Sequence, residues 1–145
     1  MDIKQLLGFA RKSSASDLHL RAGEPPLVRV HGDMKRVNVP VLTAENVREM
    51  LNTLFTETQR KTFESGQEVD FAIEVERVGR FRVNAFCHRH GEGAVFRAIN
   101  EKAPTIDELG LPPVAKDLCA RDRGLILVTG PTGSGKSTTL AAMID

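Results

Sequence analysis

The chain has 145 residues, of which 41% are hydrophobic and 27% are charged, and its formal net charge is +1. This length has room for one ordinary domain, or for one small domain and part of another. The charge balance and the absence of Trp and Tyr give no argument for nucleic-acid binding, and no apolar run approaches the ~20 residues of a membrane-spanning helix.

The N-terminal half is predicted to mix helices and strands. Apolar residues at helical spacing predict an amphipathic helix over residues 2–12, and the alternation in residues 16–21 predicts a strand with Leu18 and Leu20 facing the core. Two further strands, over residues 27–31 and 34–39, are expected to form a hairpin at Gly32-Asp33.

Two helices and three strands are expected next. Thr43 is a helix cap, and Thr56 with Gln59 fits a capping box for a second helix that ends at Gly66. The strand candidates cover residues 68–75, 80–87 and 94–99, with turns at 78–79 and 91–93. This order of elements predicts an α+β domain over residues 1–100, with an antiparallel sheet and helices against one face.

The last third is predicted to contain a linker and the start of another domain. Residues 101–112 are the expected linker, and residues 113–120 are an expected helix. A buried parallel strand is predicted over residues 125–128, followed by a helix from Ser137. The second domain would therefore occupy residues 113–145 and belong to the α/β class.

The segment between that strand and that helix has the pattern of a phosphate-binding loop. Gly130 to Ser137 reads G-x-x-x-x-G-K-S, the Walker A motif. Its glycines let successive backbone N–H groups point at an anion, and the following helix adds its free N–H groups and positive dipole end. Lys136 can reach the β- and γ-phosphates, and the Ser137 hydroxyl can bind Mg²⁺.

The sequence therefore predicts binding of ATP and Mg²⁺. The predicted nucleotide-binding residues of the loop are Gly130, Pro131, Thr132, Gly133, Ser134, Gly135, Lys136, Ser137 and Thr138. The alternative is a structural glycine-rich turn between a strand and a helix, in which the lysine has no binding role.

A second cationic feature lies in the predicted sheet. In residues 80–84, Arg80 and Arg82 alternate with hydrophobic residues, and Arg97 has the same setting in the next strand. Arginine forks bind phosphate oxygens in pairs and stay charged. The residues alone leave two interpretations open, a phosphate-binding face and an ordinary solvated face of the sheet, and composition favours the second.

Other polar candidates favour structural roles. His88 and His90 share a strand face, but two histidines without further ligands are a weak indication of a metal site. His19 is expected to face away from the core as a structural or surface residue. Asp17, beside Ser16, is expected to be a turn or capping residue.

The aromatic residues and the cysteines are also expected to be structural. Four phenylalanines are predicted to lie in the core rather than on a base-stacking surface: Phe71, Phe81, Phe86 and Phe96. Cys87 and Cys119 are far apart in the sequence and are expected to be buried thiols rather than a disulfide or metal ligands.

Several blocks of this sequence resemble the secretion-superfamily ATPases. The matching blocks are Ser16-Asp17-Leu18-His19-Leu20, Gly23-Glu24-Pro25-Pro26, Arg80-Phe81-Arg82-Val83-Asn84, Phe96-Arg97-Ala98-Ile99 and residues 124–145. In combination they are similar to the retraction ATPases of type IV pili, and the resemblance covers nearly the whole chain.

The resemblance implies a PAS-like N-terminal domain joined to the start of a RecA-like ATPase domain. It implies a homohexameric ring in the cytoplasm, peripheral to the inner membrane at the pilus base, where it acts on the base machinery. ATP turnover there drives pilus retraction, twitching motility and DNA uptake. It also implies that Arg82 and Arg97 approach the phosphates of the bound nucleotide.

No catalytic residue is assigned within the chain. The family's Asp box, Walker B motif and His box follow the phosphate loop and have no counterpart in these 145 residues. We therefore expect ATP hydrolysis from the full-length protein and none from this piece alone. Two alternatives stay open: another P-loop enzyme such as a small-molecule kinase, and a non-enzymatic module for assembly and partner docking.

Overall fold

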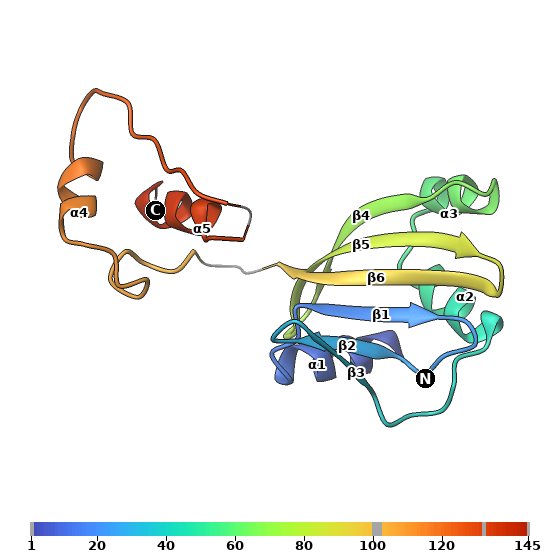
Figure 1. Ribbon diagram of the computed structural model, residues 1–145. Helices are drawn as coiled ribbons and strands as arrows, with labels where there is room; N and C mark the ends of the chain where they lie inside the picture. Colours follow the sequence, from blue (N-terminus) through green and yellow to red (C-terminus); the bar gives the residue numbers. More distant parts are fainter. Residues whose placement is uncertain (1, 100–102, 132, 145) are drawn as a thin grey trace. The chain divides into compact units, whose positions relative to one another are not determined.

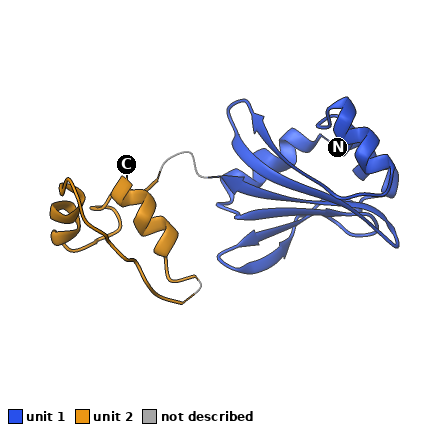
Figure 2. Ribbon diagram, turned by 90° about the horizontal axis from the view of Figure 1, so that it is seen from above, with its two compact units in different colours: residues 1–99 blue, residues 100–145 orange. Residues whose placement is uncertain are grey.

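The computed structural model describes residues 2–99, 103–131 and 133–144. The chain forms two compact units, residues 1–99 and residues 100–145 (Figure 2). Across the described ranges, every helix is too short or too polar to cross a membrane.

Unit 1 is built on one antiparallel sheet. Its elements in chain order are α1 (Ile3–Lys12), β1 (Asp17–Arg21), β2 (Leu27–Val30), β3 (Asp33–Arg36), α2 (Ala44–Asn52), α3 (Glu57–Glu64), β4 (Val69–Val75), β5 (Gly79–His88) and β6 (Gly91–Ile99). The strand order is β3-β2-β1-β6-β5-β4, and every neighbouring pair is antiparallel (Figure 1). The expected α+β arrangement of sheet and helices is confirmed.

The core lies between the sheet and the three helices, which all cover the same face (Figure 2). Strand residues alternate between the two faces, so every second side chain enters this core. The largest fully buried side chains are Phe81, Phe96, Leu7, Leu18, Leu20, Leu42, Leu51, Val47, Val83 and Pro26. The opposite face has no described helix of unit 1 on it, and we call it the open face.

Side-chain caps set the start of α2 and α3. At α3, Gln59 N donates to Thr56 Oγ1 and Thr56 N donates to Gln59 Oε1, which confirms the predicted capping box. Thr43 caps α2 as expected, and Asn46 completes the same reciprocal pair there. Each helix thus begins with two of its backbone donors satisfied.

Several boundary predictions in the sheet were wrong. β3 begins at Asp33, which the sequence placed in the hairpin turn, and it ends at Arg36 rather than at residue 39. The turn between β5 and β6 is Arg89-His90, and residues 91–93 are already the first residues of β6. Gly93 is glycine because the ring of Phe86 crosses it: a Cβ there would lie 2.8 Å from Phe86 Cε2. Phe86 is therefore on the open face rather than in the core.

The prediction of buried thiols was also wrong, since Cys87 and Cys119 are both exposed. Cys87 lies near the end of β5, and Cys119 is the last residue of the short helix α4 (Val114–Cys119). At the end of an element, alternation or helical spacing no longer ensures that a neighbouring element covers the side chain.

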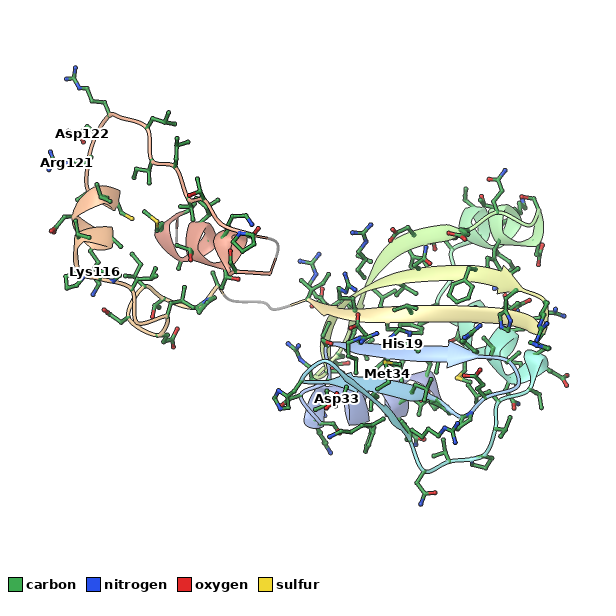
Figure 3. All side chains as sticks on the ribbon, in the orientation of Figure 1. His19, Asp33, Met34, Lys116, Arg121 and Asp122 are labelled. Atoms are coloured by element: carbon green, nitrogen blue, oxygen red, sulfur yellow. The ribbon has the colours of Figure 1, made fainter. Side chains whose placement is uncertain are left out.

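Unit 2 contains α4 and α5 (Lys136–Ile144). Lys116 of α4 donates from Nζ to Asp107 Oδ2 at 2.7 Å (Figure 3). The strand predicted over residues 125–128 is absent from the described residues, and Leu125 and Leu127 are 83% and 74% exposed. A strand forms by pairing with a neighbour, and the described part of unit 2 offers this segment no partner.

Candidate functional site

The loop before α5 has a backbone that only glycine adopts easily. Gly133 and Gly135 have φ values of 82° and 89°, in the left-handed region. At Gly130 a Cβ would lie 2.7 Å from Ser134 Oγ, so a larger residue would push into the loop. The spacing of glycines in the motif thus follows from the path of the chain. Thr132 lies outside the described residues.

The first turn of α5 has backbone N–H groups that donate to no acceptor among the described residues. The first backbone hydrogen bond into the helix runs from Thr139 N to Gly135 O at 2.8 Å. The N–H groups of Lys136, Ser137 and Thr138 come before it, where an α-helix has no carbonyl to offer them. An anion at this end would meet those N–H groups and the positive end of the helix dipole.

Lys136 is held over the loop. Its Nζ donates to the carbonyl oxygen of Pro131 at 2.7 Å, which places an ammonium group across the turn from residue 131 to the helix. A lysine in this place is a mobile positive charge that can exchange the carbonyl for a phosphate oxygen. The residue types and backbone of this loop therefore fit a nucleotide phosphate, with the Ser137 hydroxyl on the first turn of α5 as a ligand for Mg²⁺.

The open face of unit 1 has a row of charged side chains at one level of the sheet. Asp17 on β1 is directly opposite Arg29 on β2 and Arg97 on β6, and Arg97 is in turn opposite Arg82 on β5. Arg82 and Arg97 also line a shallow hollow of about 340 Å³, together with Asp70, Asn84 and Val95. The two arginines named from the sequence are thus neighbours on one surface.

Each of these two arginines has a carboxylate partner. Arg82 donates from Nε and Nη2 to the two oxygens of Asp70, at 3.0 and 2.6 Å, and this pair is exposed. Its hydrogen bonds lower the pKa of Asp70. Arg97 donates from Nε to Asp17 Oδ1 at 2.9 Å. Both arginine side chains are largely in solvent, and each keeps N–H groups without an acceptor among the described residues.

Asp17 is not the turn or capping residue that the sequence predicted. It is 5% exposed and lies within β1. Its carboxylate accepts hydrogen bonds from Arg97 and the Ser16 hydroxyl and forms an ion pair with Arg29. Burial alone would raise the pKa of Asp17, but the hydrogen bonds from Arg97 and Ser16 outweigh it and the pKa is lowered. Alternation placed Asp17 opposite the core face, but no pattern in the sequence indicated its cross-strand partners.

His19 lies next to Asp17 on the same face of β1, away from the core as expected (Figure 3). Burial lowers the pKa of His19 more than Asp17 raises it, so the imidazole is neutral near pH 7. Its Nε2 is buried and has no hydrogen-bond partner among the described residues. A neutral imidazole in this position is consistent with a structural role for His19 on the open face of the sheet.

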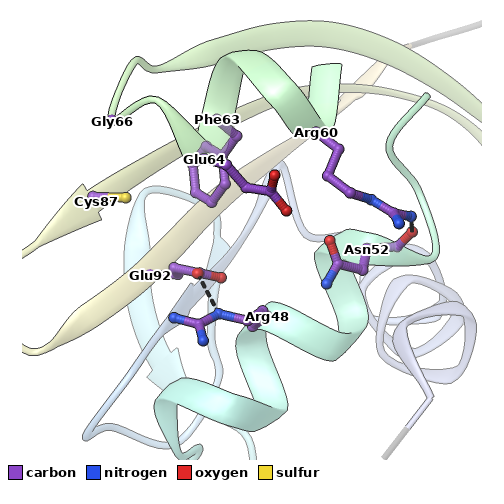
Figure 4. Close-up of a pocket in the computed structure, with 8 residues that line it drawn as sticks. All are labelled: Arg48, Asn52, Arg60, Phe63, Glu64, Gly66, Cys87 and Glu92. Atoms are coloured by element: carbon purple, nitrogen blue, oxygen red, sulfur yellow. Dashed lines mark hydrogen bonds and ion pairs between the residues drawn. The ribbon is translucent and has the colours of Figure 1, made fainter. Parts of the chain in front are cut away.

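A second cavity lies on the helix-covered side of unit 1, between α2, α3 and the ends of β5 and β6 (Figure 4). Its volume is about 360 Å³, and Arg48 donates across it from Nε to Glu92 Oε1 at 2.7 Å. Cys87 is among its lining residues. The cavity shares no lining residue with the hollow of the open face.

The two histidines at the end of β5 and in the following turn lie close together, without a third ligand side chain among the described residues. His88 and His90 have ring centroids 5.9 Å apart, and the described residues contain no group of three or more His, Cys, Asp or Glu side chains that could hold a metal ion. Two of the sequence candidates have side chains or N–H groups gathered in one place. They are the loop at 130–138 in unit 2 and the pair Arg82 and Arg97 in unit 1.

The fold and the motif define a class: an α+β domain followed by a loop and helix with the Walker A pattern. The family model described as "Type II/IV secretion system protein" matches residues 1–145. The chain belongs to this family.

Named relatives agree with this family. The type IV pilus retraction ATPase PilT of Pseudomonas aeruginosa is 54% identical over 145 residues, which are 100% of this chain and 42% of that protein. A twitching motility protein of Neisseria gonorrhoeae is 49% identical over 120 residues, 83% of this chain and 32% of that protein. The chain thus spans less than half the length of these relatives.

The structural comparison gives the same result. A crystal structure of the pilus retraction motor PilT with bound ADP matches with a TM-score of 0.86 and 43% identity, over 99% of this chain and 42% of that one. The expected similarity to the pilus retraction ATPases is therefore confirmed by sequence and by fold.

Proposed function

We propose that this chain is the N-terminal part of an ATP-driven motor that retracts type IV pili. The observation that supports this most is the Walker A loop at the start of α5, in a chain 54% identical along its whole length to a pilus retraction ATPase. A small-molecule kinase, which the motif alone left open, has no support from a family model that matches all 145 residues.

In this proposal residues 130–138 bind the phosphates of ATP, and Ser137 binds the accompanying Mg²⁺. The glycine backbone, the free N–H groups of α5 and the ammonium group of Lys136 support it. Bound Mg²⁺ would neutralise charge on the β- and γ-phosphates. The related PilT structure contains ADP, a nucleotide of the same chemical class.

Arg82 and Arg97 are proposed to contact phosphate oxygens as well. Their side chains are 68% and 70% exposed on the open face of unit 1, and each guanidinium group has N–H groups that no described residue accepts. Arginine suits this task because it stays charged and can offer two parallel hydrogen bonds to a phosphate.

The domain assignment and the assembly are part of the same proposal. Residues 1–100 would be a PAS-like domain, residues 101–112 a linker and residues 113–145 the start of a RecA-like ATPase domain. The full-length protein would form a homohexamer in the cytoplasm at the pilus base. This follows from the similarity to PilT and from the place of the motif in the chain.

The direction of the motor is tested in cells. Deleting the gene in the source organism should abolish twitching and leave pili on the surface, because an extended pilus that cannot be withdrawn gives no traction. Surface pili are counted by electron microscopy, and twitching is measured on agar. Complementation with the full-length gene should restore twitching. Loss of the pili themselves would mean an extension motor, and unchanged twitching would exclude a pilus motor altogether.

A further inference from the structure

Asp17 is the most connected charged residue of the open face. Its carboxylate is 5% exposed and accepts from Arg97 Nε at 2.9 Å and from Ser16 Oγ at 2.8 Å, while Arg29 Nε lies 3.4 Å away. Two hydrogen-bond donors and a nearby second guanidinium group offset the cost of removing this carboxylate's charge from water. The position therefore holds a fixed negative charge between two arginines.

The backbone pairing of β1 and β6 alone brings Asp17 and Arg97 close together. Ala98 N donates to Ser16 O at 3.0 Å and Ala22 N donates to Glu92 O at 3.2 Å, which sets the alternation of hydrogen bonds between β1 and β6. Asp17 and Arg97 follow the first of these pairs and are a non-hydrogen-bonded pair, where side chains approach most closely. The carboxylate thus has its place fixed by two paired strands.

The way in which Arg97 is held leaves its ends free. Asp17 engages Nε, the nitrogen nearest the aliphatic stem, and the structure shows no other hydrogen bond from this guanidinium to the described residues. Both terminal nitrogens can then donate to a ligand. Arg82 differs, because its pair with the exposed Asp70 uses Nη2 as well as Nε.

We infer that Asp17 is a positioning residue for Arg97: it fixes the guanidinium by Nε so that the two terminal nitrogens face a phosphate. An exposed arginine otherwise samples many rotamers and loses that freedom on binding. Holding it in advance removes this cost from the binding step and from the transition state. The inference rests on the proposed function, since it needs Arg97 to act on a nucleotide.

A merely structural carboxylate would behave differently, and the chain offers a matched control. Glu92 is also buried, at 9% exposure, and also holds one largely exposed arginine, Arg48, by a 2.7 Å hydrogen bond. This pair lies on the helix-covered side of the sheet, away from the hollow that Arg97 lines. Glu92→Gln thus removes a comparable ion pair without touching Arg97.

The test is a double-mutant cycle in the full-length protein, with kcat and KM for ATP and the melting temperature measured for every variant. Asp17→Asn should lower kcat/KM about tenfold, the size of one lost charge-assisted hydrogen bond. In an Arg97→Ala background the same change should alter kcat/KM by less than about twofold, because nothing is left to position. Glu92→Gln should leave kcat/KM within about twofold of wild type.

The inference is overturned if Asp17→Asn lowers activity equally with and without Arg97, or if Glu92→Gln lowers it as much. If Asp17→Asn does not fold, the cycle is run with Asp17→Glu, which keeps the charge and shifts the carboxylate by one methylene; full activity of that variant also overturns it. Failure of the proposed function has another signature, namely wild-type protein without ATP turnover.

Discussion

Replacing Lys136 with alanine is expected to reduce ATP turnover of the full-length protein at least a hundredfold. The ammonium group of Lys136 lies over the phosphate loop, where it donates to Pro131 O. Phosphoryl transfer depends on positioning and on neutralising charge at the γ-phosphate, and loss of one preorganised donor at such a site costs about 10²–10³ in kcat. The measurement is steady-state phosphate release with saturating MgATP.

A second lysine of unit 2 provides the control. Lys116 pairs with Asp107 on the surface, and Lys116→Ala should leave turnover within about twofold of wild type. Both variants should melt close to the wild-type temperature. If Lys136→Ala keeps more than a tenth of the wild-type turnover, the loop is not the phosphate site of this motor.

Replacing Arg82 or Arg97 with alanine is expected to lower kcat/KM for ATP about tenfold or more in each case. Within the described part of the chain each guanidinium group keeps N–H groups without an acceptor on the open face, and a hydrogen bond between charged groups accounts for a loss of this size. Arg82 is mostly in solvent and its partner Asp70 is exposed, so Arg82→Ala should change the melting temperature by no more than about 3 °C. Arg97→Ala should lower the melting temperature further, because it takes a hydrogen-bond donor from the buried carboxylate of Asp17.

The matched control for these variants is Arg36→Ala. Arg36 is an exposed arginine on the edge strand β3, at the other end of the sheet from β5. It should leave kcat/KM unchanged within about twofold. If the melting temperature of the Arg82 variant falls in step with its activity, Arg82 is a structural part of the sheet and its interpretation as a phosphate-binding residue is wrong.

Local patterns predicted the fold of unit 1 well. Leu18 and Leu20 are buried as their alternation indicated, and the reciprocal bonds of Thr56 and Gln59 are those of the predicted capping box. Such features depend on residues close in the sequence. The start of β6 was missed because its glycines are typical of turns, whereas Gly93 here leaves room for the ring of Phe86 from the neighbouring strand.

The strand expected over residues 125–128 shows a second kind of limit. Its apolar run is typical of a strand buried in a parallel sheet, but a strand exists only through hydrogen bonds to a neighbour. The described residues of unit 2 supply none, and the segment stays outside any strand, with Leu125 and Leu127 exposed. The apolar composition of a segment indicates that it can form a buried strand, but it does not indicate whether a neighbouring strand is present to pair with it.

One part of the candidate site could be predicted from the sequence and another part could not. Residues 130–138 could be named from the sequence because all their chemistry is contiguous and the left-handed turns require glycine. The setting of Asp17 could not, because its partners Arg29 and Arg97 are distant in the sequence and meet it only through the register of three strands. A pattern within one strand identifies a face but not what lies opposite.

The most direct test of the central claim is a structure of the full-length protein with Mg²⁺ and ADP or a non-hydrolysable ATP analogue. In that structure we expect phosphate oxygens within hydrogen-bond distance of the N–H groups at residues 133–138. We also expect Lys136 Nζ to have moved from Pro131 O to a phosphate. A nucleotide bound elsewhere, with Lys136 still donating to Pro131, would contradict the central claim.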